Sequence, residues 1–380
     1  MLRFAERTGL TSGQSPRRYL WTDAFAVCNF LGLAQATGDG RHVDLALRLV
    51  DQVHHVLGRH RADDTRAGWI SGLADRDGEL HPTRGGLRIG KRLPERRPEE
   101  PFDERLEWDR DGQYFHYLTR WMHALDQASR STRQPLFNTW ARELAAASHR
   151  GFTTGPRARG GRRMVWKMSI DLSRPLVPST GHHDPLDGFI TCVQLETTAA
   201  MLSSAADEAM QEAVADFRRM IEDREDWVTE DPLGLGGLMT DACRVEQLAE
   251  SGAFAGGGEL LETLLAAALE GVAHYARHGD VGAPASRRLA FRELCLAIGL
   301  HAIAHLQGRV EAGCFAGGDR SRSCLRALEP YGVLGSTIES FWLEPEHQRA
   351  STWTEHRDIN EVMLATSLAP TGYVVLHPLA

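Results

Sequence analysis

Two kinds of helical pattern alternate along the chain. In the first kind, apolar side chains occupy nearly every position, as expected for a helix that is buried on all sides. The segments 23–31 and 114–125 are of this kind. Four further segments share the pattern: 189–195, 238–248, 289–306 and 359–368. The chain therefore predicts six buried helices.

The second kind of segment carries an apolar stripe on one face and charged residues on the other. Apolar residues recur at i, i+3, i+4 and i+7, which is the spacing of an amphipathic helix. Four segments keep this spacing clearly: 43–57, 137–145, 206–221 and 261–272. A weaker fifth segment at 325–342 is interrupted by Pro330. These segments predict helices on the surface of the fold.

Buried helices that alternate with surface helices require a layered all-α architecture. Closing the layers into a ring covers both faces of each buried helix, so we predict an (α/α)6 toroid of alternating inner and outer helices, with residues 1–380 as a single domain. An open solenoid would repeat every roughly 34 to 47 residues. The predicted inner helices start at unequal intervals, near residues 22, 112, 186, 239, 288 and 358. With only five outer helices predicted, one outer helix is either irregular or missing.

The longest segment without helical periodicity runs over residues 61–107. It contains Gly85-Gly86 and the charged, proline-rich stretch 94–101, and it leads directly into a polar helix start. A loop of this length inside a compact domain is typical of a functional element or of disorder. We expect either a wall or lid over a cleft or a surface excursion. The best strand signal in the chain lies here, at residues 87–89.

Polar and aromatic residues gather where the inner helices are predicted to begin. If the inner helices run parallel, these residues converge at one end of the toroid in a polar, acidic cleft. Asp and Thr also serve as N-caps, which explains one acid at each start but not a second acid or a tryptophan beside it. The six starts are Trp21-Thr22-Asp23, Trp108-Asp109-Arg110-Asp111, 182–187, Met239-Thr240-Asp241, Ser286-Arg287-Arg288 and 355–361.

Carboxylates next to aromatic rings are typical of sugar sites, because ring faces stack on C–H patches and the acids handle hydroxyls and protons. Hydrolysis of a glycosidic bond needs two carboxyls that flank the substrate. The candidate catalytic acids are Asp109, Asp111, Asp184, Asp187, Asp358 and Glu361. The candidate substrate contacts are Trp21, Asp23, Trp108, Tyr114, His182, Trp353 and Arg357.

Composition and missing motifs exclude several other functions. A net charge of −8 and a pI near 6.1 argue against a nucleic-acid partner. The chain has no P-loop, no GxGxxG after a strand and no GxSxG elbow. We expect no cofactor, and no metal site at His182, His183 and Asp184 or at the His301/His305 pair, which has no acid within its motif. Without an apolar leader or an apolar stretch of 18 residues, we expect a soluble cytoplasmic protein with no membrane partner and leave its oligomeric state open.

Four segments resemble the helix starts of the six-hairpin glycosidase superfamily of (α/α)6 toroids, which includes the N-acylglucosamine 2-epimerase-like proteins. They read RRYLWTDAFAVCNF, EWDRDGQYFHYL, TGHHDPLDGF and EHRDINEVML, and the resemblance spans most of residues 15–370.

The resemblance implies an intracellular glycoside hydrolase that inverts the anomeric centre of a small or oligomeric sugar. Its acid and base would be Asp109 or Asp111, Asp184 or Asp187, and Asp358 or Glu361. The epimerases of the superfamily imply His183 and His356 as the acid and base of a sugar 2-epimerase or isomerase instead. A non-catalytic sugar-binding or scaffold protein is the third alternative.

Overall fold

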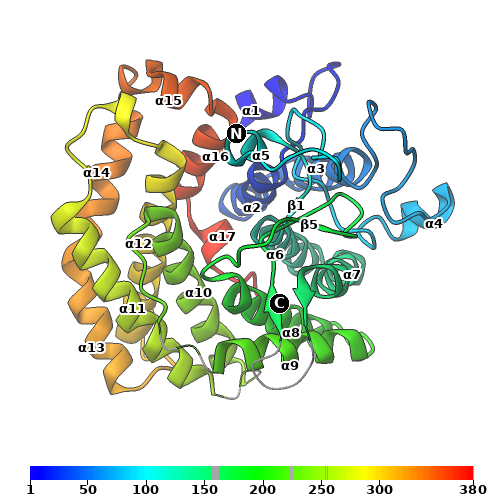
Figure 1. Cartoon of the computed structure of the whole chain (residues 1–380). Helices are drawn as coiled ribbons and strands as arrows, with labels where there is room; N and C mark the ends of the chain where they lie inside the picture. The colour runs from blue at the N-terminus through cyan, green and yellow to red at the C-terminus, as the bar shows by residue number, and fades with distance from the viewer. Residues whose placement is uncertain (156–161, 223, 225, 253, 255, 380) are drawn as a thin grey trace. The chain divides into compact units, whose positions relative to one another are not determined.

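The computed structural model describes residues 1–155, 162–222, 224, 226–252, 254 and 256–379 (Figure 1). The chain divides into two compact units. Unit 1 comprises Met1 and Glu225–Leu376, and unit 2 comprises Leu2–Arg224 and His377–Ala380. Helices dominate both units, which confirms the predicted all-α class.

Unit 2 consists mainly of three helical hairpins. These pair α2 (Leu20–Thr37) with α3 (Arg41–Leu57), α6 (Phe115–Thr132) with α7 (Pro135–Phe152), and α8 (Asp184–Met201) with α9 (Glu208–Glu222). The first helix of each pair is buried along much of its length, and the second buries a narrower face. Gly38 ends α2 in the left-handed region, with φ of 70°, so the chain turns back at once into α3.

Unit 1 repeats this alternation. It contains α10 (Pro232–Glu250), α11 (Gly257–His278), α12 (Ala290–Glu311), α13 (Asp319–Leu328), η2 (Glu329–Tyr331), α14 (Gly332–Leu343) and α16 (Arg357–Leu368). The outer segment that was predicted with an interruption at Pro330 is the pair α13 and α14 joined by η2, as expected. Gly236 on α10 and Gly299 on α12 let the two helices approach closely. A Cβ on Gly236 would lie 2.1 Å from the Cys295 carbonyl oxygen.

The inner helices of each unit begin at a shared end. In unit 2, the Tyr19 and Tyr117 hydroxyls lie 2.6 Å apart at the starts of α2 and α6, and Arg120 on α6 pairs with Asp187 on α8 at 3.1 Å. In unit 1, Arg292 on α12 pairs with Asp231, the N-cap of α10, at 2.9 Å. The His356 ring before α16 lies 5.7 Å from the Phe291 ring on α12. The predicted parallel arrangement is therefore present within each unit.

The remaining elements are short. The long connection in unit 2 contains α4 (Asp75–Leu80) and α5 (Glu104–Asp109), and the rest of 61–107 is mainly irregular. The strand signal at 87–89 does not correspond to a strand: these residues bond singly to Leu57, Gly112 and Leu20 instead of forming a ladder. The strands are β1 (Gln113–Tyr114), β2 (Thr153–Thr154), β3 (Arg163–Met164), β4 (Lys167–Met168) and β5 (Pro175–Val177), in the orders β1-β4-β5 and β2-β3. The other helices are α1 (Leu2–Arg7), η1 (Ala285–Arg287), η3 (His347–Arg349), α15 (Ser351–Thr354) and α17 (Thr371–Val374).

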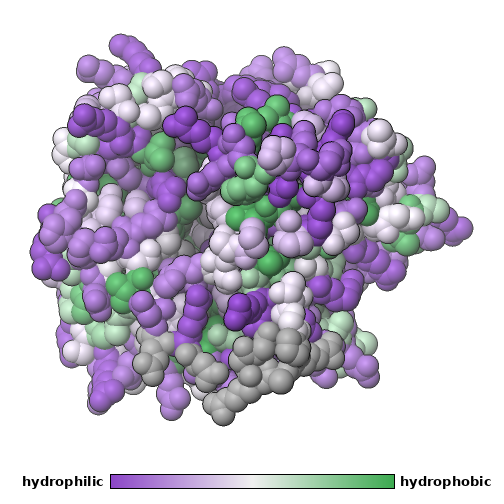
Figure 2. Space-filling model, in the orientation of Figure 1, coloured by the Kyte–Doolittle hydropathy of each residue, from purple (hydrophilic) through white to green (hydrophobic). Residues whose placement is uncertain are grey.

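The face in Figure 2 is mostly hydrophilic, and its hydrophobic areas are small and separate. Among the described residues, no helix combines the length and the apolar character that crossing a bilayer would require.

Candidate functional site

Seven rings meet where α2 and α6 begin, and we call them the aromatic cluster. Its centre is Tyr114, whose ring centroid lies 5.3 Å from Tyr117, 5.4 Å from His116 and 5.1 Å from Trp166. Trp21 packs against Tyr117 at 5.2 Å. The full cluster comprises Tyr19, Trp21, Trp108, Tyr114, His116, Tyr117 and Trp166.

One side of the aromatic cluster faces solvent. Trp108, at the end of α5, is 49% exposed, and its ring lies 5.0 Å from Trp166 just before β4. Trp166 is itself partly exposed and stacks on His116 with an angle of 12° between the ring planes. Such a surface offers apolar ring faces beside hydrogen-bonding edges, which is what a sugar ring requires.

Asp184 opens α8 as a buried carboxyl group. Its Oδ2 has no hydrogen-bond partner within the described part of the chain, and the residue is 5% exposed. Burial, and to a lesser extent the neighbouring carboxylate of Asp187, raise the pKa of Asp184 to about 7, against the lowering effect of Arg120. This carboxyl is therefore protonated up to near neutral pH.

Asp187, one turn along α8, is held in the opposite state. Its carboxylate accepts hydrogen bonds from Arg120 at 3.1 Å and from the Thr119 hydroxyl, both in the first two turns of α6. A guanidinium at this distance stabilises the charged form. The start of α8 thus places a buried carboxyl group with a raised pKa one helical turn from a carboxylate that pairs with a guanidinium.

His116, a member of the aromatic cluster, lies near enough to Arg120 and Asp187 for their charges to act on its imidazole. Burial, and to a lesser extent the positive charge of Arg120, lower the pKa of His116 to about 3, although the negative charge of Asp187 opposes this. The imidazole is therefore neutral across the physiological range. It is partly exposed, so it can meet a ligand as a neutral donor or acceptor.

Asp109 and Lys91 lie at the exposed side of the same cluster. Asp109 is exposed, and its charge acts on Tyr19, Tyr114 and Lys91. The Lys91 ammonium lies 5.5 Å from the centroid of the Tyr19 ring, and burial lowers the pKa of Lys91. The Asp109 carboxylate and the Lys91 ammonium can therefore contact a ligand that lies on the aromatic cluster.

Asp111, two residues after Asp109, has a different environment. It is fully buried, and its oxygens accept from Arg88 at 2.6 Å and from the backbone N–H groups of Gly90 and Gly112 at 3.0 and 3.1 Å. These contacts tie the connection 61–107 to the start of β1. They favour a structural role for Asp111.

The carboxylate of Asp23 is likewise engaged in contacts at the start of its own helix, α2. It accepts the Tyr19 N–H at 2.9 Å and pairs with the buried Arg18 at 3.4 Å.

At the start of α8, His182 is exposed and its carbonyl oxygen accepts from Arg224. The rings of His182 and His183 lie 4.6 Å apart, and His183 is the N-cap residue. These contacts place the two histidines beside Asp184.

The candidates of unit 1 form their own group at the start of α16. Trp353 is 2% exposed and stacks on Trp342 at 5.6 Å, which favours a core role over the predicted substrate contact. His356 and Arg357 are exposed, and Asp358 and Glu361 are partly exposed.

Other groups of potential ligands are occupied by ion pairs. Among the described residues, one set of three groups has donor atoms close enough for a metal ion: His149, Glu212 and Asp216. Asp216 already pairs with Arg162 at 3.1 Å and with Arg219, which supply the positive charge that a cation would bring. His301, for its part, bonds Glu339 on α14 at 2.7 Å, an acid that its own motif does not contain.

Several residues of this site were not predicted from the sequence. Tyr19, His116, Tyr117 and Trp166 have no spacing that marks them, although the first three lie within three residues of Trp21 or Tyr114. Arg120 and Lys91 reach the site from the second turn of α6 and from the long connection. Only tertiary packing brings them to the helix starts.

Gly181 gives a first prediction for this geometry. A Cβ at this position would lie 2.3 Å from Asp184 Oδ2, so Gly181→Ala is expected to displace that carboxyl. Activity is expected to fall about tenfold or more, because misplacement of a reacting group is costly, while thermal stability changes little. Gly282→Ala is the matched control, since its Cβ would meet nothing within 4 Å. Equal activity in the two variants would mean that activity does not depend on the position of the Asp184 carboxyl group.

No protein-family model matches the sequence, and no curated protein matches it. Among solved structures, the chain is similar to a GH76 alpha-mannanase from Bacteroides thetaiotaomicron, with 10% sequence identity, a TM-score of 0.54, and coverage of 97% of this chain and 94% of that chain. It is also similar to a cellobiose 2-epimerase from Spirochaeta thermophila, with 11% identity, a TM-score of 0.47, and coverage of 92% and 86%. The likeness to the mannanase confirms the predicted fold, the six-hairpin (α/α)6 toroid.

Proposed function

We propose that the protein is a glycoside hydrolase in which Asp184 is the general acid. The observation that carries this proposal is the buried carboxyl of Asp184, with a pKa of about 7, beside the ionised Asp187. A general acid must be protonated at the working pH and still able to give up its proton, so a pKa near neutrality suits the role. The aromatic cluster supplies the surface on which a sugar ring stacks.

Asp109 is our candidate for the general base. It is exposed, unlike Asp111, and its charge acts on rings of the same aromatic cluster. An inverting glycosidase needs a second, ionised carboxylate that activates water on the face of the sugar opposite the acid. Asp109 and Asp184 belong to different segments, α5 and α8, and the proposal requires that the sugar lies between their two carboxyl groups.

The fold likeness to an alpha-mannanase makes α-linked mannosides the first substrates to test. The assay is release of 4-nitrophenol from α- and β-glycosides and of reducing ends from α-mannan. The anomer formed first, read by proton NMR, tests inversion. Turnover of any glycoside that Asp184→Asn abolishes supports the proposal. Binding of the same panel without turnover would make the protein a sugar-binding protein instead.

His116, the imidazole within the aromatic cluster, does not suit the base of an epimerase. A base with a pKa of about 3, as for His116, is too weak to abstract a proton efficiently near pH 7. Epimerisation through His183 or His356 would appear as conversion of a reducing disaccharide in the same NMR assay. Its loss in His183→Gln, with Asp184→Asn still active, would replace the hydrolase proposal.

The pH profile follows from the state of Asp184. Because the acid must carry its proton, kcat/KM is expected to fall as pH rises above about 7, by about tenfold per pH unit. The measurement is kcat/KM from pH 5 to 9 on the best aryl glycoside. A profile that is flat above pH 7, on a substrate whose chemistry is rate-limiting, would remove Asp184 from the acid role.

A further inference from the structure

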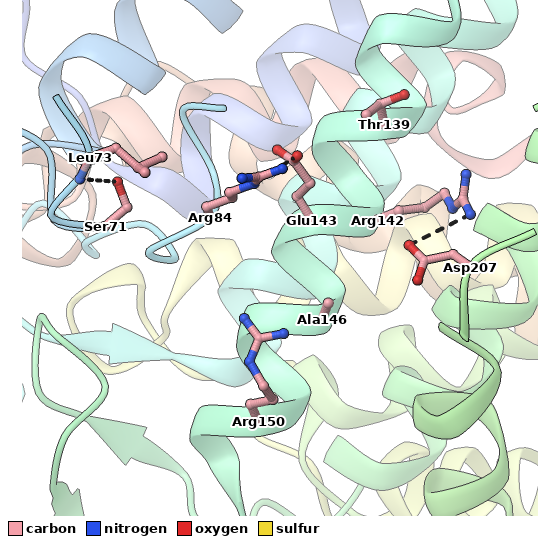
Figure 3. A pocket seen from close by; sticks show the side chains of 9 residues that line it. All are labelled: Ser71, Leu73, Arg84, Thr139, Arg142, Glu143, Ala146, Arg150 and Asp207. Carbon is pink, nitrogen blue, oxygen red and sulfur yellow. Dashed lines mark hydrogen bonds and ion pairs between the residues drawn. The ribbon is translucent and has the colours of Figure 1, made fainter. Parts of the chain in front are cut away.

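A pocket of about 420 Å³ lies along one face of α7, apart from the residues of the aromatic cluster. Residues three or four positions apart on α7 line it, together with Ser71, Leu73 and Arg84 from the long connection and Asp207 just before α9 (Figure 3). The α7 residues are Thr139, Arg142, Glu143, Ala146 and Arg150. We call this the arginine pocket, and all of it belongs to unit 2.

The arginine pocket carries more positive than negative charge. Three guanidiniums face two carboxylates, Glu143 and Asp207. Glu143 is shared between Arg84 at 3.0 Å and His81 at 2.6 Å. Arg150 is exposed, and within the described part of the chain it makes no hydrogen bond or ion pair. In Figure 3 its side chain extends along the helix toward Ala146, beside the open space of the pocket.

Arg142 is held only loosely by its acidic neighbours. It is 8% exposed and donates one hydrogen bond, to the Ala205 carbonyl oxygen at 3.0 Å. Its ion pairs with Asp207 and Glu196 are long, at 3.6 and 3.4 Å, and its Nε has no hydrogen-bond partner among the described residues. A buried guanidinium with unused donors gains from a better-placed oxyanion.

We propose that the arginine pocket binds a small oxyanion, the phosphate or carboxylate group of a metabolite. Arg150 from α7 and Arg84 from the long connection would hold it, since the planar guanidinium presents paired N–H donors that match such groups. Ser71 Oγ accepts the Leu73 N–H at 3.4 Å, which leaves its own O–H free to donate. This site is independent of the proposed hydrolase chemistry.

Two probes test the proposal on the full chain. Inorganic phosphate is followed by ³¹P line broadening, and glucuronate by saturation-transfer NMR, each at low and high salt. Arg150→Gln is expected to weaken binding about tenfold, because it removes a charged donor from an exposed position. Arg326→Gln on α13 is the matched control, since Arg326 is equally exposed and lies outside the pocket.

A second variant, which is expected to strengthen oxyanion binding, makes the test sharper. Glu143→Gln removes a negative charge and loosens its hold on Arg84, so it is expected to tighten binding several-fold. Phosphate binding alone, or glucuronate binding alone, would identify the preferred oxyanion. Failure of both probes to bind, or equal binding by Arg150→Gln and Arg326→Gln, would overturn the proposal. Weaker binding in Glu143→Gln would also overturn it.

Discussion

Replacing Asp184 by Asn is expected to lower kcat about 10²- to 10⁴-fold on the best glycoside of the panel. The substitution keeps the shape of the side chain and removes the proton that the leaving group requires. Because Asp184 is buried with an unpartnered oxygen, Asn fits the same space. KM is expected to change much less, since the loss concerns the transition state and not the stacking surface.

Stability gives the control for this loss of activity. The pKa of Asp184 is about 7 in the folded protein and about 3.9 in an unfolded chain, so the folded state binds the proton more tightly. The resulting stability is complete below pH 4 and is lost as pH rises through 7. Asn cannot ionise, so urea denaturation should show Asp184→Asn gaining stability relative to the wild type between pH 4 and pH 8.

The two measurements together separate a catalytic carboxyl from a structural one. Lower stability of Asp184→Asn at pH 8, together with lost activity, would mean that the carboxylate is needed for folding. Full activity with the expected gain in stability would mean that a different group protonates the leaving oxygen. Lost activity with retained or raised stability is the result that we expect.

The helical architecture was predictable because its signal is local. The apolar run at 23–31 and the stripe at 43–57 each report burial through their own spacing, and these became α2 and α3. The interruption at Pro330 was predictable for the same reason, since a proline in the interior of a helix removes a backbone donor and breaks the helix. The strand signal at 87–89 misled because these apolar residues are buried by the loop around them without pairing into a ladder.

Only those site residues that lie at the starts of inner helices could be predicted from the sequence. Asp184 and Trp21 were found because inner helices begin there. His116, Lys91 and Arg120 were missed, because their relation to the site depends on how α6 and the long connection pack. Trp353 shows the converse: it lies beside polar residues in the sequence but stacks on Trp342 in the core of unit 1.

The second prediction with a large expected effect compares Asp109 and Asp111. Both were candidate acids of one helix start, but Asp109 is exposed and Asp111 is buried. Asp111→Ala is expected to lower the free energy of unfolding by about 3–5 kcal/mol, because it leaves the buried Arg88 without its partner. Asp109→Ala is expected to change it by less than about 0.5 kcal/mol, as for other exposed positions. Urea denaturation at pH 7 measures both.

Activity is expected to respond in the opposite order. Asp109→Ala should lower kcat/KM by about 10²-fold or more if Asp109 activates water, with the fold intact. Asp111 also accepts the Lys91 N–H at 3.3 Å, so a folded Asp111→Ala protein should lose activity only through displacement of that segment, and Asp111→Asn should restore part of it. A stable, inactive Asp111→Asn beside a fully active Asp109→Ala would exchange the two roles. The base would then be a buried carboxylate, and the exposed Asp109 would have no part in the reaction.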